Sequence, residues 1–274
     1  MSKEKLCVII PIYKDDPDDI ELISIRNTVK SLDPYPVFFA APEGIKMDAY
    51  SCVPEVKLSL FPARYFESIR SYNNLMLDPF FYKTFNNYEY MLIVQPDAYI
   101  IGDKDKLEYF LNMDYDYIGA PWKDTHRMRK LFFDLYYLRW NRIKPLFWIF
   151  GGKEIGVRVG NGGLSLRKIG STIKLLRRFI FYRKIWGANE DVFFANFGNR
   201  CGKRYRIAPV DVAERLSLEE TAPYRFDKTD PPFGVHDWEQ YLPELKETMG
   251  TDHVVFLRQP QNHEVRPHGP RGPV

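Results

Sequence analysis

The stretch Tyr88–Ile101 (YEYMLIVQPDAYII) constrains the fold more than any other part of the sequence. Its apolar run Met91–Val94 is typical of a short strand that is buried on both faces of a sheet. Pro96 cannot donate a hydrogen bond to a neighbouring strand, so we expect the strand to end or bulge there. This places Gln95 and Asp97 at the carboxyl end of a buried strand, where open α/β sheets bind ligands. An Asp in an ordinary turn is the plain alternative.

The N-terminal part of the chain predicts a strand–helix–strand unit. Leu6–Tyr13 and Val37–Ala41 are apolar runs typical of buried strands. Between them, an acidic cluster at 15–19 suits a helix N-terminus, and Asp33-Pro34 ends that helix. Strands that alternate with helices in this way favour an α/β fold with a largely parallel sheet. A short strand is also expected at Tyr205–Val210.

Loop and helix residues near these strands are candidates for a nucleotide pocket. Tyr13 is placed to contact a base and Glu43 a ribose hydroxyl, although both residues are also ordinary in turns. Arg70 lies near the start of a helix expected to end at Asp78-Pro79, where it would contact a diphosphate or simply face solvent. The chain contains neither GxGxxG nor GxxxxGK[ST], which argues against a dinucleotide site or a P-loop.

The composition is that of a globular chain with little net charge. Its 274 residues are 45% hydrophobic and 27% charged, enough for a sizeable core, and the net charge of +3 gives no reason to expect a nucleic-acid partner. Cys7, Cys52 and Cys201 share no CxxC or CxxH spacing, which predicts a reducing, cytoplasmic compartment. Cys7 lies in an apolar run and is expected to be buried. We expect neither a signal peptide nor a transmembrane helix.

Two stretches combine basic residues with large aromatic ones. They are residues 123–150 and Arg167–Trp186 (RKIGSTIKLLRRFIFYRKIW). Such stretches bind a membrane interface or a nucleic acid, form a cationic flap over phosphates, or pack on the sheet as an amphipathic insertion. We expect a single domain over 1–248 with an insertion at 123–150, and a peripheral contact with the inner face of a membrane. Residues 249–274 lose all pattern, which predicts a disordered tail.

Three further motifs place glycine or polar residues at predicted element ends. Gly160–Gly163 (GNGG) is expected to be a loop, where glycine allows close backbone approach or a hairpin turn. Glu190 and Asp191 follow Asn189 at a helix start, as ordinary first-turn acids or as a general base with a partner that orients it. His236 lies in a loop bounded by proline and glycine. With Asp97 it would suit Mn²⁺ or Mg²⁺, with water and phosphate completing the shell.

In this order, the motifs resemble those of GT-A-fold nucleotide-sugar glycosyltransferases, close to a bacterial family of glycosyltransferase-like proteins, the DUF5672 type. The resemblance covers residues 6–241 and is carried by Gln95–Ala98 (QPDA), Gly119–Trp122 (GAPW), Gly160–Arg167 (GNGGLSLR), Asn189–Asp191 (NED) and Phe233–His236 (FGVH). It implies a GT-A-like, Rossmann-like α/β fold with a mixed, mostly parallel sheet flanked by helices. It also implies transfer of a sugar from a nucleotide diphosphate, most often UDP, to a glycan or lipid-linked acceptor in surface polysaccharide synthesis.

The resemblance assigns roles to individual residues. Asp97 matches the second acid of the DxD metal motif, and His236 matches the late histidine of the metal and diphosphate site. Gln95 stands where the first acid usually is, and a neutral amide binds a cation less strongly than a carboxylate. Asp191 matches the catalytic base of the inverting enzymes, with Glu190 beside it. The loop near the donor sugar and acceptor is matched by Asn161, Gly162 and Gly163.

The implied chemistry is a single displacement at the anomeric carbon. A cation and basic groups offset the charge that develops on the leaving diphosphate. A carboxylate on the opposite face, Asp191, deprotonates the acceptor hydroxyl, and one such base predicts inversion.

Three other functions use similar residues. A glycoside hydrolase also needs two carboxylates that flank a sugar. A non-catalytic carbohydrate- or lipid-binding module would bind glycans or anionic vesicles without a nucleotide. A nucleotidyltransferase uses carboxylates and magnesium, but with more acids than this chain offers. The fold does not choose among these functions, so the choice rests on the site.

Overall fold

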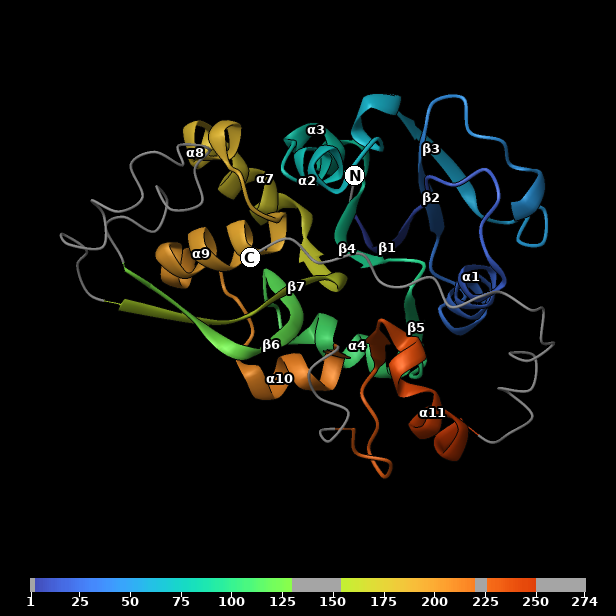
Figure 1. The fold of residues 1–274 in the computed structure, drawn as a ribbon. Coiled ribbons are helices and arrows are strands. Elements are labelled where there is room, and N and C mark those ends of the chain that lie inside the picture. Colours follow the sequence, from blue (N-terminus) through green and yellow to red (C-terminus); the bar gives the residue numbers. More distant parts are fainter. Residues whose placement is uncertain (1–2, 130–153, 220–225, 250–274) are drawn as a thin grey trace.

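A six-stranded mixed sheet forms the centre of the protein in a computed structural model that describes residues 3–129, 154–219 and 226–249 (Figure 1). The strand order is β3-β2-β1-β4-β7-β6. The parallel strands are β1 (Glu4–Pro11), β2 (Val37–Pro42), β3 (Lys57–Phe61) and β4 (Tyr88–Val94). An antiparallel pair, β7 (Glu154–Lys168) and β6 (Tyr117–Arg129), extends the sheet beyond β4. The predicted mixed, mostly parallel sheet is confirmed.

The central strands are buried because both of their faces are apolar. On β4, Leu92 and Val94 enter the core beneath one face of the sheet, whereas Met91 and Ile93 enter the core beneath the other. Cys7 on β1 is fully buried in the second core, as predicted. Two separate cores of this kind require a layer of helices on each face.

Helices cover both faces of the sheet, as Figure 1 shows. One layer contains α1 (Asp19–Ser31), α4 (Lys104–Asn112) and α10 (Val210–Leu216). The other contains α2 (Ile69–Met76), α3 (Pro79–Thr84), α7 (Ile169–Arg178), α8 (Ile180–Ile185) and α9 (Glu190–Cys201). Short 3-10 turns lie at Asp48–Tyr50, Ala63–Tyr65, Gly202–Arg204 and Trp238–Tyr241.

A second, three-stranded sheet brings the C-terminal part of the chain to the end of β4. Its strands are β5 (Ala98–Ile100), β9 (Gly234–His236) and β8 (Ser217–Leu218). It packs with α11 (Leu242–Met249) around a small third core. Because Ala98 pairs with His236, the histidine comes to lie beside Asp97. The expectation that His236 lies in a loop was therefore wrong, since it ends a strand.

The expected loop at Gly160–Gly163 was also wrong, because these residues lie inside β7. None of them has a positive φ, so no turn requires glycine here. Instead, a Cβ on Gly163 would overlap the His236 ring, and one on Gly162 would crowd the Glu190 carboxylate. Glycine permits these close approaches, and the register of the β6–β7 pair shifts opposite them.

The remaining expectations concern a strand at Tyr205–Val210 and an insertion at 123–150. The strand expected at Tyr205–Val210 was wrong: Ile207 makes one isolated bridge to Tyr117, and α10 then starts at Val210. Of the expected insertion at 123–150, only the backbone of 123–129 is described, as part of β6. The rest of the insertion, and the tail expected after Met249, lie outside the described residues. The limits of the single domain stay a prediction.

Candidate active site

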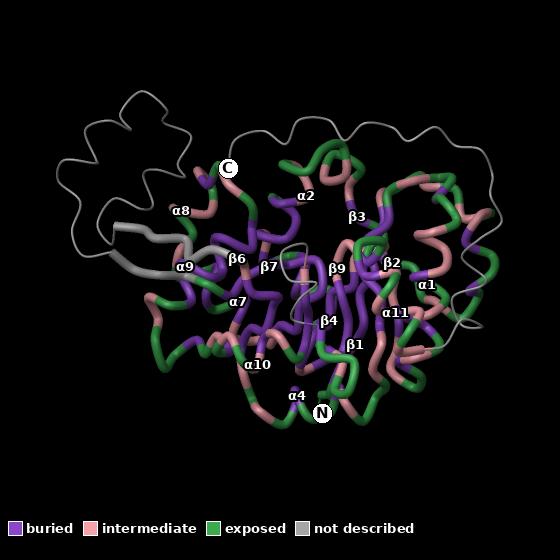
Figure 2. The backbone as a smooth tube through the Cα atoms, turned by 60° about the horizontal axis from the view of Figure 1, so that its bottom comes forward, coloured by how far each residue is buried: buried purple, intermediate pink, exposed green. Residues whose placement is uncertain are grey.

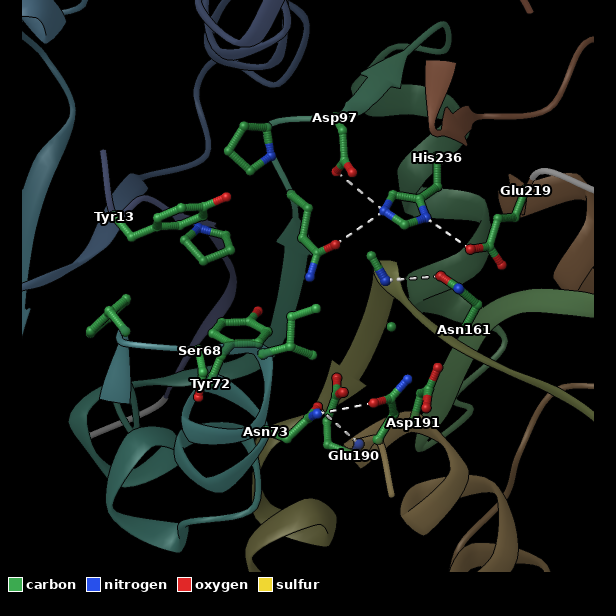
Figure 3. Close-up of a pocket in the computed structure, with 18 of the residues that line it drawn as sticks. Tyr13, Ser68, Tyr72, Asn73, Asp97, Asn161, Glu190, Asp191, Glu219 and His236 are labelled. Atoms are coloured by element: carbon green, nitrogen blue, oxygen red, sulfur yellow. Dashed lines mark hydrogen bonds and ion pairs between the residues drawn. The ribbon is translucent and has the colours of Figure 1, made fainter. Parts of the chain in front are cut away.

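A pocket of about 640 Å³ lies at the carboxyl edge of the parallel strands. Its walls come from the chain after β1, the turn after β4, the middle of β7, helix α2, the start of α9 and the end of β9. Figure 3 shows Asp97, His236 and Glu219 along one side and Glu190 and Asp191 along the other. This is the edge at which the sequence predicted a ligand site.

His236 is the centre of the first side of the pocket. Its Nε2 lies 3.2 Å from Asp97 Oδ1 and 3.0 Å from Gln95 Oε1, and its Nδ1 lies 3.2 Å from Glu219 Oε1. Burial lowers the pKa of His236, but the hydrogen bonds and charges of Asp97 and Glu219 outweigh burial and raise it to about 10. The free site therefore holds a protonated imidazole between two carboxylates.

These residues fit a divalent cation. Two ligands that share an octahedral Mg²⁺ or Mn²⁺ at ~2.1 Å stand about 3 Å apart, which matches the spacing around His236 Nε2. Glu219 sits on the other ring nitrogen, where a carboxylate orients a metal-ligating histidine. Across the described residues, no group of three or more His, Cys, Asp and Glu side chains could hold a metal. A cation here therefore needs the Gln95 amide and oxygens from its ligand.

The second side of the pocket is the start of α9. Asn189 precedes the helix as predicted, but its side chain does not cap it. Instead, Asn189 Oδ1 accepts a hydrogen bond from Asn73 Nδ2, and Asn73 Oδ1 accepts one from the backbone nitrogen of Glu190, both at 3.1 Å. Asn73 of α2 thus holds the first turn of α9 in place, facing the pocket.

The neighbouring acids Glu190 and Asp191 differ in their contacts, because Glu190 forms an ion pair with Arg167. This fully buried side chain on β7 donates to Glu190 Oε1 at 2.9 Å and to the Tyr82 hydroxyl at 2.8 Å. Its guanidinium also lies over the rings of Phe194 and Tyr117, with 4.9 and 5.4 Å to the centroids. Glu190 is therefore held as one half of a buried ion pair, which suits a structural role better than proton transfer.

Asp191 is the second acid of this helix start. It lines the pocket, and its Oδ1 accepts a hydrogen bond from the backbone nitrogen of Val192 at 2.6 Å. Burial raises the pKa of Asp191 well above its usual value, and the neighbouring charge of Glu190 raises it further. A carboxylate with a raised pKa is, in its ionised form, a stronger base than an exposed one.

The floor of the pocket is β7 at Asn161–Gly163. Asn161 Oδ1 accepts a hydrogen bond from the Gly163 nitrogen at 3.0 Å, and the Gly163 carbonyl accepts one from the Gln95 nitrogen at 2.8 Å. The second bond ties this floor to the turn that carries Asp97. The space next to Gly162 is occupied by the Glu190–Arg167 pair and the space next to Gly163 by the His236 ring, so the glycines allow these side chains to pack closely against the strand.

The pocket lining is strongly acidic. Among the described residues that line it, none is lysine or arginine, and the carboxylates are Glu21, Glu67, Asp97, Glu190, Asp191 and Glu219. Arg167 neutralises Glu190 from beneath, and His236 lies between Asp97 and Glu219. An anionic ligand would therefore need a cation to enter this side of the pocket.

Most predicted site residues meet in this pocket, but two do not. Tyr13 lines it with 58% of its surface exposed. Glu43 and Arg70 are both exposed and do not line it. The Glu43 nitrogen donates to the Phe61 carbonyl at the end of β3, and Arg70 lies on α2 between the lining residues Ile69 and Tyr72. Neither residue therefore lines this pocket, and their roles in nucleotide binding stay predictions.

Three contributors were missed by sequence reasoning. Glu219 follows a strand of only two residues, which is too short to give a periodic signal. Asn73 is one of several polar residues on α2, and nothing in the sequence links it to α9. Arg167 was visible only as a basic residue after an apolar run, although a charged residue within a strand that pairs with β4 had to be buried and paired.

The sheet order, the small second sheet and the position of the pocket define a GT-A-like fold. Mouse xyloside xylosyltransferase 1 shares it with a TM-score of 0.51 and 11% identity, covering 85% of this chain and 97% of that chain. At this identity the likeness establishes the fold alone. A weaker likeness, with a TM-score of 0.46 and 10% identity, is to the WbbM bifunctional glycosyltransferase, covering 92% of this chain and 52% of that chain.

The chain belongs to the family described as "Protein of unknown function (DUF5672)", which matches residues 55–236. The predicted family is thereby confirmed. No curated protein matches the sequence.

The buried ion pair makes a prediction about stability. Glu190→Gln leaves the Arg167 charge uncompensated in the core and is expected to lower the free energy of unfolding by roughly 3 kcal/mol. Glu67→Gln, the same change at an exposed lining residue, should alter it by less than ~0.5 kcal/mol. Urea unfolding of the two variants measures both values. Equal effects would show that the pair does not hold α9 against β7.

The raised pKa of His236 makes a prediction about pH. Since the pKa rises on folding from 6.5 to about 10, the protonated ring stabilises the fold fully below pH 6.5 and loses this effect as the pH approaches 10. The difference in unfolding free energy between wild type and His236→Gln should therefore shrink over that window. Asp97→Asn, which removes one flanking carboxylate, should weaken the pH dependence. A difference that is constant from pH 6 to 10 would contradict this account.

Proposed function

We propose that this protein is an inverting glycosyltransferase that moves a sugar, of the hexosyl type, from a nucleotide-diphosphate donor to a hydroxyl acceptor. The observation that carries the proposal is the opposition of two groups across one pocket. Gln95, Asp97 and His236 suit a cation and a diphosphate on one side, and the buried acid Asp191 faces them from the other. A single displacement needs a leaving-group site and a base on opposite faces of the sugar.

The diphosphate side of the proposal rests on charge. The donor carries negative phosphates, and the described lining offers carboxylates rather than lysine or arginine. A divalent cation, Mn²⁺ or Mg²⁺, would neutralise the leaving diphosphate when bound. Gln95, Asp97 and His236 would hold it, and Glu219 would keep the ring in the neutral tautomer that exposes Nε2. Binding would therefore displace the proton that His236 carries in the free site.

The base side of the proposal rests on Asp191. Its carboxylate would take the proton from the acceptor hydroxyl as the oxygen attacks the anomeric carbon. Glu190 would act as a positioning residue, because its pairing with Arg167 fixes the first turn of α9 and its charge helps to raise the pKa of Asp191. Ionised Asp191 is the active form, so the rate should rise with pH through its raised pKa.

The remaining pocket residues suit the two ends of a nucleotide sugar. Tyr13 presents an exposed ring at the end of β1, where a base can stack on it. The Asn161–Gly163 floor lies between the two sides in Figure 3, where the transferred sugar would sit. We propose UDP as the nucleotide and a surface polysaccharide or lipid-linked glycan, made on the cytoplasmic side of the membrane, as the acceptor.

Removing the base tests this proposal. With a panel of nucleotide sugars, Mn²⁺, and water or simple glycosides as acceptors, Asp191→Asn should release nucleoside diphosphate at least ~100-fold more slowly than wild type. The chemical change is conservative, and binding of the donor should persist.

Glu67→Gln is the matched control, because it alters another lining carboxylate and should keep most of the rate. Full activity in a folded Asp191→Asn protein would remove Asp191 from the reaction. Hydrolysis of a glycoside without any nucleotide would identify the protein as a glycoside hydrolase instead.

A further inference from the structure

The exposed side of α7 and α8 carries a surface that the pocket does not use. This α7–α8 surface consists of the exposed residues Lys174, Arg177, Arg178, Ile180, Phe181 and Lys184. In α7, the residues Ile173, Leu175 and Leu176 face the core, so Lys174, Arg177 and Arg178 share the solvent side. Phe179 ends α7 with non-helical dihedral angles, and α8 then carries the exposed residues Ile180, Phe181 and Lys184.

The charge of this surface has one sign. From Arg167 to Asn189 the sequence contains no aspartate or glutamate. Two basic residues at the start of this segment form ion pairs. Arg167 pairs with Glu190, and Lys168 pairs with Glu89 and Asp114. Within the part of the chain that the structure describes, Lys174, Arg177, Arg178 and Lys184 form no ion pair with an acid.

Two apolar side chains lie in the middle of this basic surface. Phe181 is 65% exposed and Ile180 is 48% exposed, and α8 has no buried residue. Basic residues around exposed apolar ones are the pattern of a helix that lies in the interface of a bilayer. A soluble polyanion would explain the lysines and arginines, but it gives no reason to expose an isoleucine.

The α7–α8 surface also adjoins the pocket. Arg183 of α8 donates from Nη1 to the carbonyl of Leu77, at the end of α2, at 3.2 Å. Helix α2 lines the pocket through Tyr72 and Asn73, and its Ile69 is 78% exposed at the same lining. In Figures 1 and 2, α2 and α8 both lie along the upper side of the molecule. A flat partner on α8 would therefore lie beside the pocket.

We propose that the α7–α8 surface docks the protein on an anionic membrane. The arginines and lysines face the acidic headgroups, and Ile180 and Phe181 enter the interface. None of the described helices is long and apolar enough to span a bilayer. The inference stands apart from the proposed function, because it uses no pocket residue.

Vesicle co-sedimentation of the full chain tests this inference. Wild type should bind phosphatidylcholine vesicles that contain 30% phosphatidylserine and should not bind pure phosphatidylcholine. Lys174→Glu/Arg177→Glu/Lys184→Glu should bind at least ~100-fold more weakly, as expected for the loss of three basic contacts. Ile180→Ser/Phe181→Ser should also weaken binding, by at least ~10-fold, because the apolar anchor is lost.

The matched control is Lys30→Glu/Lys46→Glu/Lys104→Glu, which changes the net charge equally at exposed residues away from α7 and α8. It should retain binding within a few-fold. No binding by wild type, or equal losses in the two charge variants, would overturn the proposal. Full vesicle binding by Ile180→Ser/Phe181→Ser together with displacement by heparin would identify a soluble polyanion as the partner. Nucleotide binding, measured without vesicles, reports separately on the proposed function.

Discussion

The buried ion pair between Arg167 and Glu190 is the contact on which the pocket depends. It joins the central sheet to the first turn of α9, with both side chains almost fully withdrawn from water. A buried charge of this kind is tolerated only when it is paired and hydrogen-bonded, and Tyr82 and Ser165 complete the bonding of the guanidinium. The pair occupies the space beside Gly162, where any side chain would collide with it. Among the described residues, Asp191 shares in no such ion pair, which is why we propose Asp191 and not Glu190 as the base.

On the opposite side of the pocket, two carboxylates are also close together, and here the positive charge between them belongs to a titratable histidine. His236 separates Asp97 and Glu219, and its positive charge offsets one of their two negative charges. A divalent cation would supply the same balance with more charge to spare for a diphosphate. The Gln95 amide fits this arrangement, since it offers an oxygen ligand without adding a further negative charge to an acidic lining. In the proposed cation site, this would account for an amide at the position where the motif usually has its first acid.

The sequence predicted correctly those elements that a local pattern of residues identifies. It did not predict the contacts between residues that are far apart in the chain. The apolar run before Gln95-Pro96-Asp97 placed that turn correctly at the sheet edge, because buried parallel strands are continuous hydrophobic runs. The glycines of β7 were interpreted as a loop. Glycine occurs both in turns and in strands that another group approaches closely, and the sequence alone does not separate the two cases. Glu219 and Asn73 could not be found, since each matters only through a partner far away in the chain. Glu43 was expected at the pocket because it follows a strand. It does not line the pocket, and its backbone nitrogen donates to the Phe61 carbonyl at the end of β3.

The central claim is that this pocket takes a nucleoside diphosphate with the help of a cation at Asp97. Calorimetric titration of nucleoside diphosphates into the protein, with and without Mn²⁺, tests it most directly. The account predicts that one of them, UDP first, binds in Mn²⁺ and binds at least ~10-fold more weakly without the metal or in Asp97→Ala, a loss of about 1.4 kcal/mol or more. If no nucleoside diphosphate binds under either condition to the folded protein, the claim is contradicted, and the pocket serves a ligand of another kind.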